Sequence, residues 1–590
     1  MQDKIIWEPS DQIKEESNVS LLMKKFGIDA PMDLLRRSTV DQEWFWVTLE
    51  NELNVSWDSP YSKVFDFSRG VEFSRWFIEG EFNISKQMLD VQIERGLGNR
   101  NAIIYEDEEG RRQSITYGML LNAVCSLSTL LMERGVRKGD RVGILMPLIP
   151  ETIVALLAIL RIGAIAEPVF SGFGENAVLS RFSDASIIAC ITVREFRRRG
   201  KVVTYDSIIA RLREVLPSLK EVLMLEADVL SRIDGNSGIS EWSPSYKSSV
   251  FLPAKRTLAE DTALIMYSSG TTGRPKGTVH THIGAFLQPS KENKYNLDLK
   301  TGDRLFWYSD IGWVMGPWAI IGALSQGATL VLMGGVPDYP TNNRFFRFID
   351  ELKITTLGVS PTLIRSLRGH DESAPDRFEM DHLRIIASGG EPWDMKNYMW
   401  LFNRIGRCRA PIINLSGGTE LMGCLLIPLP VLPLKPLTLQ SPGLGMDVDV
   451  LDEMGNSVTG QVGHLVCRKP VPSMTKGFWN DYEAYLKTYW SSYPGIWYHA
   501  DWSFKDSEGF WFLLGRSDDV IKVGAKRIGP SEIEEIVLGE EGVRETATIG
   551  VPDEAKGESI ICFTVLGEGA NAKAIKESSF RRIREMLGKP

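Results

Sequence analysis

The sequence alternates between short apolar segments and longer amphipathic ones, and this alternation constrains the fold more than any other feature. Residues 102–105 have the composition of a strand, residues 116–134 that of an amphipathic helix, and residues 141–146 that of a buried strand. A helix expected over residues 151–162 is followed by a glycine, the usual stop signal. This order and spacing predict an α/β fold in which helices cover parallel sheets.

The same alternation recurs at residues 180–191, 261–267, 328–333 and 354–359. We find no internal repeat of fixed period. With 590 residues the chain exceeds what a single core organises, so two or more domains are expected. An apolar content of 43% and a charged content of 24% are ordinary for a globular protein with a large core.

Composition also narrows the class of function. A formal charge of −9 argues against a general nucleic-acid surface, so an anionic ligand needs local basic groups. The 6 cysteines are scattered without metal-type spacing and are typical of reduced, mostly buried thiols. Residues 1–18 lack the apolar core of a secretion signal, and the most apolar stretches, residues 142–169 and 421–434, are interrupted by charges or prolines. We therefore expect a cytoplasmic protein with no membrane span.

A loop rich in hydroxyls and glycines follows the apolar residues 263–267. Its central residues are Ser269, Gly270, Thr271, Thr272 and Gly273. Glycines let backbone amides approach an anion, hydroxyls donate to it, and Lys276 adds a movable positive charge. Pro275 stands where the common P-loop has glycine, which disfavours a kinase or GTPase. The loop predicts a polyphosphate site, the alternative being a flexible surface turn.

Two further strand-to-turn segments carry polar residues. Residues 385–392 run from an apolar strand into a glycine turn, a place where ligands bind at the edge of parallel sheets. Residues 414–420 end in Thr419 and Glu420, and a carboxylate beside a hydroxyl suits Mg²⁺ with a phosphate. On local evidence alone, the first segment could be a plain strand-to-helix turn.

These segments carry a resemblance to a known family. Residues 267–277 closely match the signature of the adenylate-forming superfamily, which contains acyl-CoA synthetases, carrier-loading adenylation domains and luciferases. Residues 76–77, 82–85 and 335–340 resemble the acetyl-CoA synthetase branch. The resemblance spans nearly the whole chain and implies a ligase that uses ATP, CoA and Mg²⁺.

The resemblance implies a role for individual residues. Lys276 and Arg527 would balance charge on the departing phosphates, Thr419 would bind the α-phosphate, and Glu420 would bind the metal. The nucleotide would also contact Gly390, Glu391, Pro392, Asn414, Asp501 and Arg516. Relatives place an aromatic residue at the position of Ser416 to stack on adenine, so this chain departs from the pattern there.

The resemblance also implies which residues line the acid and CoA sites, because the family's motifs give their positions in this chain. The acid pocket would be lined by Trp313, Val314, Met315, Gly389 and Gly417. Gly417 replaces the tryptophan that closes the acetate pocket, and Gly389 replaces a small aliphatic residue, so we expect an acid larger than acetate. CoA would contact Arg194, Arg197, Gly524 and Ala525, although a charge run is usually just a solvated face.

The domain organisation is expected to follow the family. Residues 1–95 would form an N-terminal cap, residues 96–517 the AMP-binding core, and residues 518–590 a small mobile α+β domain that swings about the hinge Asp518. The family places a lysine in a Ser/Thr-Gly-Lys turn near its C-terminus. Lys589 does not match that turn, so we expect the C-terminal domain to be incomplete or the protein to be a truncated form.

The expected activity is therefore the conversion of a small carboxylic acid, ATP and CoA to acyl-CoA, AMP and pyrophosphate, on a short-to-medium or branched chain acid. One alternative is an adenylation enzyme that loads a carrier protein. Another is a non-catalytic protein that binds ATP or an acyl group. A homo-oligomer and the identity of the acid are left open.

Overall fold

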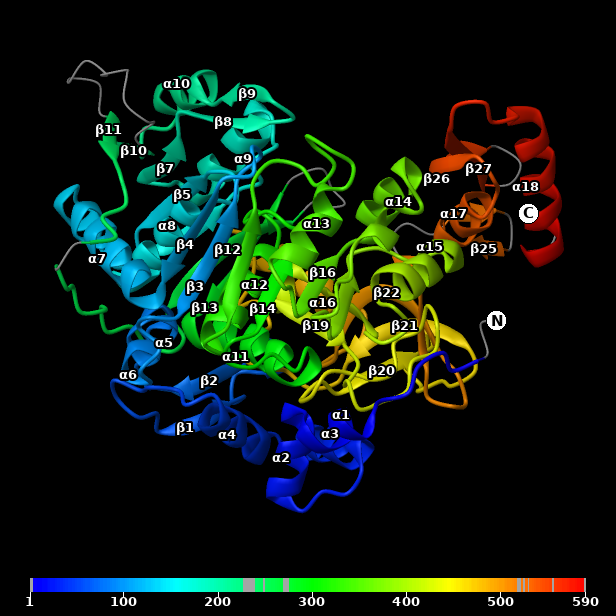
Figure 1. Cartoon of the computed structure of the whole chain (residues 1–590). Helices are drawn as coiled ribbons and strands as arrows, with labels where there is room; N and C mark the ends of the chain where they lie inside the picture. The colour runs from blue at the N-terminus through cyan, green and yellow to red at the C-terminus, as the bar shows by residue number, and fades with distance from the viewer. Residues whose placement is uncertain are drawn as a thin grey trace.

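The computed structural model describes residues 4–225, 239–247, 250–268, 275–516, 521–523, 526–528, 530–553 and 557–587. Figure 1 shows a large body built from layers of sheet and helix, with the C-terminal segment beside it as a smaller unit. The predicted α/β architecture with a small C-terminal domain is confirmed.

The first large sheet contains the strand that leads into the predicted phosphate loop. Its strands, in spatial order, are β11 (Ile239–Trp242), β10 (Glu221–Leu225), β7 (Ala189–Val193), β5 (Arg141–Leu145), β6 (Ile165–Pro168), β12 (Thr262–Ser268) and β13 (Lys276–Thr281). All neighbouring pairs are parallel except β12 with β13, which run antiparallel. Strands such as β7 are buried along their whole length, as expected where helices cover both faces of a parallel sheet.

The second large sheet presents the other predicted turns. Its strands, in spatial order, are β19 (Gly423–Leu426), β18 (Ile412–Gly418), β17 (Ile385–Gly389), β16 (Thr356–Val359), β14 (Arg304–Trp307), β15 (Thr329–Met333), β3 (Asn101–Glu106) and β4 (Arg112–Thr116). The central pairs from β18 to β3 are parallel. Because parallel strands end at the same edge, β17 and β18 bring their glycine turns together there.

The helices of the large body are α5 (Ile84–Met88), α6 (Asp90–Glu94), α7 (Tyr117–Glu133), α8 (Pro150–Arg161), α9 (Glu175–Ala185), α10 (Asp206–Val215), α11 (His282–Lys291), α12 (Met315–Ser325), α13 (Arg344–Glu351), α14 (Pro361–His370), α15 (Met395–Trp400) and α16 (Tyr482–Tyr489). Local signals set their ends. The Thr116 hydroxyl accepts from the Met119 amide at the start of α7, and Gly163, with φ 70°, follows α8. None of the described helices combines the length and apolarity needed to cross a bilayer.

Three smaller sheets complete the large body. One four-stranded sheet has the order β20 (Val448–Leu451), β21 (Val462–Cys467), β22 (Trp497–Lys505) and β23 (Trp511–Arg516). The hairpins are β1 (Lys63–Asp66) with β2 (Arg75–Ile78), and β8 (Glu195–Arg198) with β9 (Lys201–Thr204). Each of these sheets is antiparallel.

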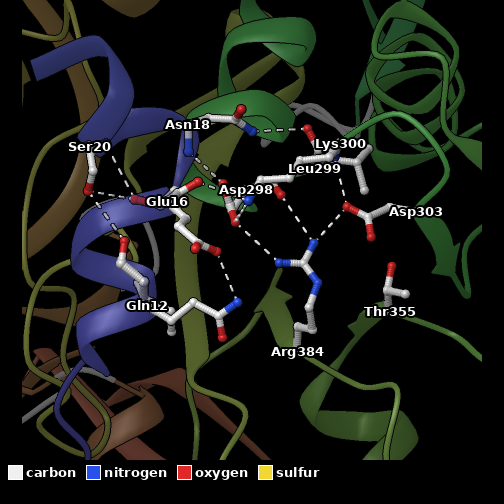
Figure 2. Close-up of polar contacts among 12 residues, drawn as sticks. Gln12, Glu16, Asn18, Ser20, Asp298, Leu299, Lys300, Asp303, Thr355 and Arg384 are labelled. Atoms are coloured by element: carbon white, nitrogen blue, oxygen red, sulfur yellow. Dashed lines mark hydrogen bonds and ion pairs between the residues drawn. The ribbon is translucent and has the colours of Figure 1, made fainter. Parts of the chain in front are cut away.

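The N-terminal helices α1 (Asp11–Glu16), α2 (Asn18–Phe26), α3 (Pro31–Val40) and α4 (Gln42–Glu52) lie along one side of the large body (Figure 1). Polar contacts anchor them (Figure 2). The Asn18 amide donates to Asp298 over 2.7 Å, and Arg384 holds the same carboxylate at 3.2 Å and Asp303 at 2.6 Å. Since Arg384 precedes β17, this network ties the start of the chain to the second large sheet.

The C-terminal unit has the strand order β25 (Lys526–Ile528), β24 (Ile521–Val523), β27 (Gly557–Leu566) and β26 (Val543–Asp553). It also contains α17 (Pro530–Leu538) and α18 (Ala572–Leu587). Ile533 and Val537 of α17 are buried with Ile560, Cys562 and Ile583 packed against them. This unit therefore has a small apolar core of its own.

Most elements expected from the alternating pattern lie within two or three residues of their predicted bounds. The proline-rich run of residues 427–436, whose composition suggests a rigid extended connection over the surface, is instead largely buried. Ile427, Leu429 and Leu434 are almost completely buried, and Leu434 forms an isolated bridge with Trp7. The run is an extended segment of the core because its apolar side chains, interspersed with the prolines, pack inward.

Candidate active site

The predicted phosphate loop is framed by β12 and β13. Ser269, Gly270, Thr271, Thr272 and Gly273 lie outside the described residues, so their roles stay predictions. Ser268 and Lys276, which flank the loop, pair directly across the antiparallel strands. The Lys276 ammonium lies 3.3 Å from the Thr488 hydroxyl and 5.2 Å from the centre of the Phe478 ring. Lys276 therefore rests beside α16, at the foot of the loop.

The second predicted motif lies where β18 turns back into β19. Thr419 and Glu420 form a single 3₁₀ turn between the two strands. Glu420 is 7% exposed, and its carbonyl accepts from the Thr475 amide over 2.7 Å. Asn414 lies in β18, largely buried. Thus the strand reversal presents a hydroxyl and a carboxylate at the same edge of the sheet.

The predicted ribose pair is brought together by strand pairing. Asp501 of β22 and Arg516 of β23 face one another across the antiparallel ladder. Arg516 Nη1 lies 3.5 Å from the Asp501 carboxylate and donates to the His499 carbonyl over 3.2 Å. A carboxylate and a guanidinium held together in this way are suited to a sugar hydroxyl next to a phosphate.

The Gly-Glu-Pro turn follows β17, and Gly390 adopts φ 97°, which favours glycine. The Glu391 carboxylate is used within the protein. It accepts from the Thr362 amide at 3.0 Å, from the Thr362 hydroxyl at 2.9 Å and from Arg365 at 2.5 Å. The side chain therefore fastens the turn, which ends in Pro392, to the first turn of α14. The backbone remains the part suited to a flat ligand.

A cavity of about 1060 Å³ joins the Gly-Glu-Pro turn to Thr419. At one end it is lined by Gly389, Gly390 and Thr419, and its wall includes Trp313, Val314 and Met315. The Trp313 ring is 45% exposed and lies 5.4 Å from the ring of Phe170. The opposite end reaches the β8–β9 hairpin. Three of the residues predicted for the acid pocket therefore share one wall.

Asp310 connects two walls of this cavity. Its carboxylate accepts from the Ser171 hydroxyl at 2.6 Å and from the Gly312 amide at 2.9 Å. Burial raises the pKa of the Asp310 carboxyl, and these hydrogen bonds act in the opposite direction. A Cβ on Gly312 would lie 2.0 Å from the Phe170 amide nitrogen, so only glycine allows the two segments to approach this closely.

Gly417 requires a correction. It does not line the cavity, and a Cβ built on it would lie 1.9 Å from the Gly423 carbonyl oxygen. Gly389 does line the cavity, but its Cβ would meet the Leu415 side chain at 2.4 Å. At both positions glycine leaves room for a neighbouring segment of the protein. The space that we expected the acid to fill at Gly417 is therefore absent.

The basic run predicted to contact CoA forms the β8–β9 hairpin. Arg194 lies 3.5 Å from Glu241 and outside the cavity, whereas Arg197 lines the cavity and lies 3.5 Å from Glu109. Arg198 also lines the cavity, and none of the described acidic residues forms an ion pair with it. Gly524, Ala525 and Asp518 lie outside the described residues, as does the Arg527 side chain.

Sequence reasoning missed one residue here and did not single out another. His499, a lone histidine in the sequence, is buried between Glu420 and Asp501. Its signal was its position two residues before Asp501. Arg198 was hidden in a run of similar charges, and only the ion pairs of its neighbours distinguish it.

The donor set fits Mg²⁺ delivered with a polyphosphate. The described residues contain no group of three or more His, Cys, Asp or Glu side chains that could hold a metal ion. Glu420 beside the Thr419 hydroxyl instead offers one carboxylate. Magnesium commonly binds one or two protein carboxylates and takes its remaining ligands from phosphate and water.

Comparisons with known proteins agree along the chain. A family model described as AMP-binding enzyme matches residues 89–479. The model of the acetyl-coenzyme A synthetase N-terminus matches residues 32–88, and the AMP-binding enzyme C-terminal domain matches residues 532–590.

Individual relatives span almost the whole chain. Acetyl-coenzyme A synthetase of Laribacter hongkongensis is 34% identical over 592 residues, covering 98% of this chain and 89% of that protein. The enzyme of the same name from Pasteurella multocida is 33% identical, covering 100% and 90%. Among solved structures, acetoacetyl-CoA synthetase from Streptomyces lividans superposes with a TM-score of 0.91 and 28% identity, covering 99% of this chain and 90% of that one.

Proposed function

Because the chain belongs to the AMP-binding enzyme family of acid–thiol ligases, we propose that it converts a carboxylic acid larger than acetate to its CoA thioester. In the first step a carboxylate oxygen attacks the α-phosphorus of ATP, and pyrophosphate leaves. In the second step the CoA thiolate attacks the acyl carbonyl, the carbonyl carbon–oxygen bond to AMP breaks, and AMP leaves. Both steps are substitutions and need no redox partner.

One observation carries this proposal: the cavity is continuous from Thr419 and the Gly390 turn, past Trp313, to the β8–β9 hairpin. The turn and Thr419 lie at the edge where a nucleotide phosphate would bind. Trp313 and Val314 provide an apolar wall for the acid. Arg198 lies at the other end, where a phosphate-bearing thiol could enter. All three substrates could therefore meet in one space.

The chain's own residues would act by binding and orientation. Thr419 would donate to the α-phosphate, and Lys276 would balance charge on the leaving phosphates together with Arg527. Asp501 and Arg516 would hold the ribose. A magnesium ion held by Glu420 and the phosphates would supply Lewis-acid charge when bound. Glu391 would keep the adenine turn fixed to α14.

The cavity wall and one relative support an acid larger than acetate. The wall carries Val314 and Met315, and the flexible Met315 side chain can adapt to a longer chain. The Streptomyces lividans protein is named for acetoacetate, an acid of four carbons. The relatives named for acetate point the other way. We therefore propose an acid of three carbons or more, with the four-carbon acids tested first.

The test compares kcat/KM for acetate, propionate, butyrate, isobutyrate and acetoacetate with ATP and CoA, measuring AMP and thioester. Each buried methylene gains about 0.8 kcal/mol, so we expect at least a roughly fourfold preference per added carbon until the pocket is full. Val314→Phe should reduce the cavity and move the preference toward acetate. Val250→Phe, at an exposed position outside the cavity, is the matched control.

Two results would contradict the proposal. A wild-type preference for acetate would refute the size of the acid, while leaving the ligase reaction in place. Acyl-AMP formation that proceeds to a pantetheinyl carrier protein but never to free CoA would instead favour the carrier-loading alternative.

A further inference from the structure

A buried histidine lies between the metal motif and the ribose motif. His499 is 1% exposed and lies in β22, two residues before Asp501. Its Nδ1 lies 3.4 Å from Glu420 Oε1, and its Nε2 lies 3.6 Å from Asp501 Oδ2. One imidazole therefore presents one nitrogen to each of two carboxylates that come from different sheets.

The surroundings of the ring fix its place. Trp497 Nε1 lies 3.5 Å from His499 Nδ1, and Arg516 donates to the His499 carbonyl over 3.2 Å. The intervening Ala500 has φ 65°, in the left-handed region that residues with a Cβ rarely adopt. This local backbone conformation is held by the surrounding strands, and backbone strain of this kind concentrates at functional sites.

We propose that His499 is a positioning residue that holds the carboxylates of Glu420 and Asp501 at a fixed separation. The phosphates and the ribose of one nucleotide can then be bound at the same time. This inference rests on the proposed function, in which Glu420 serves the metal and phosphate and Asp501 serves the ribose. Without the ring nitrogens, no imidazole would bridge the two largely buried carboxylates, and Arg516 would lie beside Asp501 alone. Repulsion would then turn Glu420 away from the phosphate.

The test uses His499→Phe, which keeps a ring of similar size and removes both nitrogens, and His499→Gln, which keeps one polar end. Residues that orient metal-binding carboxylates typically contribute 10- to 100-fold to affinity. We expect His499→Phe to raise the dissociation constant of MgATP by about tenfold or more. His499→Gln should lie between it and the wild type. The acid KM and CoA KM should stay unchanged.

His464→Phe is the matched control. His464 lies in the same sheet on β21, and its ring stacks 4.1 Å from that of Trp502. Its replacement should leave MgATP affinity at the wild-type value, although it removes an imidazole, here a partly buried one, from the same sheet.

An unchanged MgATP dissociation constant in either folded His499 variant overturns the proposal. If His499→Phe does not fold, His499→Gln decides the question by the same criterion. Binding is measured calorimetrically with neither acid nor CoA present, so it is independent of thioester formation. A wild-type protein that binds MgATP but forms no thioester would refute the proposed function, and leave the His499 measurement valid.

Discussion

At the scale of single residues, two histidines near the predicted phosphate loop are held neutral by burial. His280 is 2% exposed and His282 is fully buried. Burial lowers the pKa of each to about 4. The His282 Nδ1 accepts from the Ile84 amide at 3.4 Å, which requires an unprotonated nitrogen. An unfolded histidine titrates near 6.5, so the unfolded chain binds more protons than the folded one between about pH 4 and 6.5.

Stability should therefore fall as the pH is lowered through this window. We expect the melting temperature to drop between pH 7 and pH 5, and the drop to be smaller in His282→Gln because one of these protonations is removed. Thermal unfolding at several pH values checks this. His382→Gln, at an exposed position, is the control. A variant with the full wild-type drop would show that His282 does not contribute.

The residue scale also shows what a sequence can disclose about the site. Thr419, Asp501 and Arg516 stand out because their residue types suit phosphate and ribose, and the fold brings the last two face to face. Gly417 suggested free space in the acid pocket, because a sequence does not say which backbone segment passes beside a glycine. The signal of His499 was limited to its position before Asp501, since a lone histidine acquires its role only from the carboxylates that the fold places around it.

At the scale of elements, the β8–β9 hairpin forms a wall of the cavity and is clamped at its tip. The Glu108 carboxylate accepts from the Arg199 amide at 2.7 Å and from the Gly200 amide at 2.8 Å. Gly200 has φ 71°, and a Cβ there would lie 2.4 Å from the Tyr339 hydroxyl. The buried Glu108 therefore fixes the hairpin to the second large sheet through two charge-assisted hydrogen bonds.

We expect Glu108→Ala to loosen the hairpin and raise the CoA KM several-fold, about 1 kcal/mol or more, because two backbone donors lose their acceptor. Acyl-AMP formation, followed by pyrophosphate exchange, should be unchanged. Glu214→Ala, an exposed pair partner of Arg211 on α10, is the control. An unchanged CoA KM, or an equal loss in both steps, would contradict this role.

Element prediction from sequence succeeded where apolar periodicity was strong, as in α7, α8 and β5. It failed for the β8–β9 hairpin, because basic residues there conceal any alternation and the hairpin depends on Glu108, far away in sequence. It failed for the exposure of residues 427–436, because proline suggests a surface connection while Ile427 and Leu429 are in fact buried.

At the scale of the whole molecule, the C-terminal unit lies against the large body near α14. A smaller cavity of about 340 Å³ is lined by Thr362 and Arg365 of α14 and by Leu538 and Arg544 of the C-terminal unit. Arg365 also holds Glu391. Only α14 thus separates the turn predicted to bind adenine from the C-terminal unit. The proposed second step requires this unit to rotate.

Asp518→Pro should slow thioester formation more than acyl-AMP formation, because proline fixes φ at the residue predicted to rotate. Pyrophosphate exchange measures the first step, and single-turnover transfer from acyl-AMP to CoA measures the second. Asp506→Pro, in the β22–β23 turn that precedes β23, would provide a backbone change away from the hinge. Equal loss of both steps in Asp518→Pro would remove Asp518 from the hinge role.

The anchoring of the N-terminal helices has a consequence for synthesis on the ribosome. Asn18 depends on Asp298, Trp7 donates to the Arg409 carbonyl, and Gln42 donates to the Pro470 carbonyl. At roughly 5–20 residues per second, these partners emerge on the order of tens of seconds after the helices themselves. Throughout that interval α2 and α4 can pack only on each other and on nearby segments, as Phe26 does on Trp44 and Trp46 on Trp76. Docking of the N-terminal helices onto the large body is therefore a late event of synthesis, which cannot finish before Pro470 has been translated.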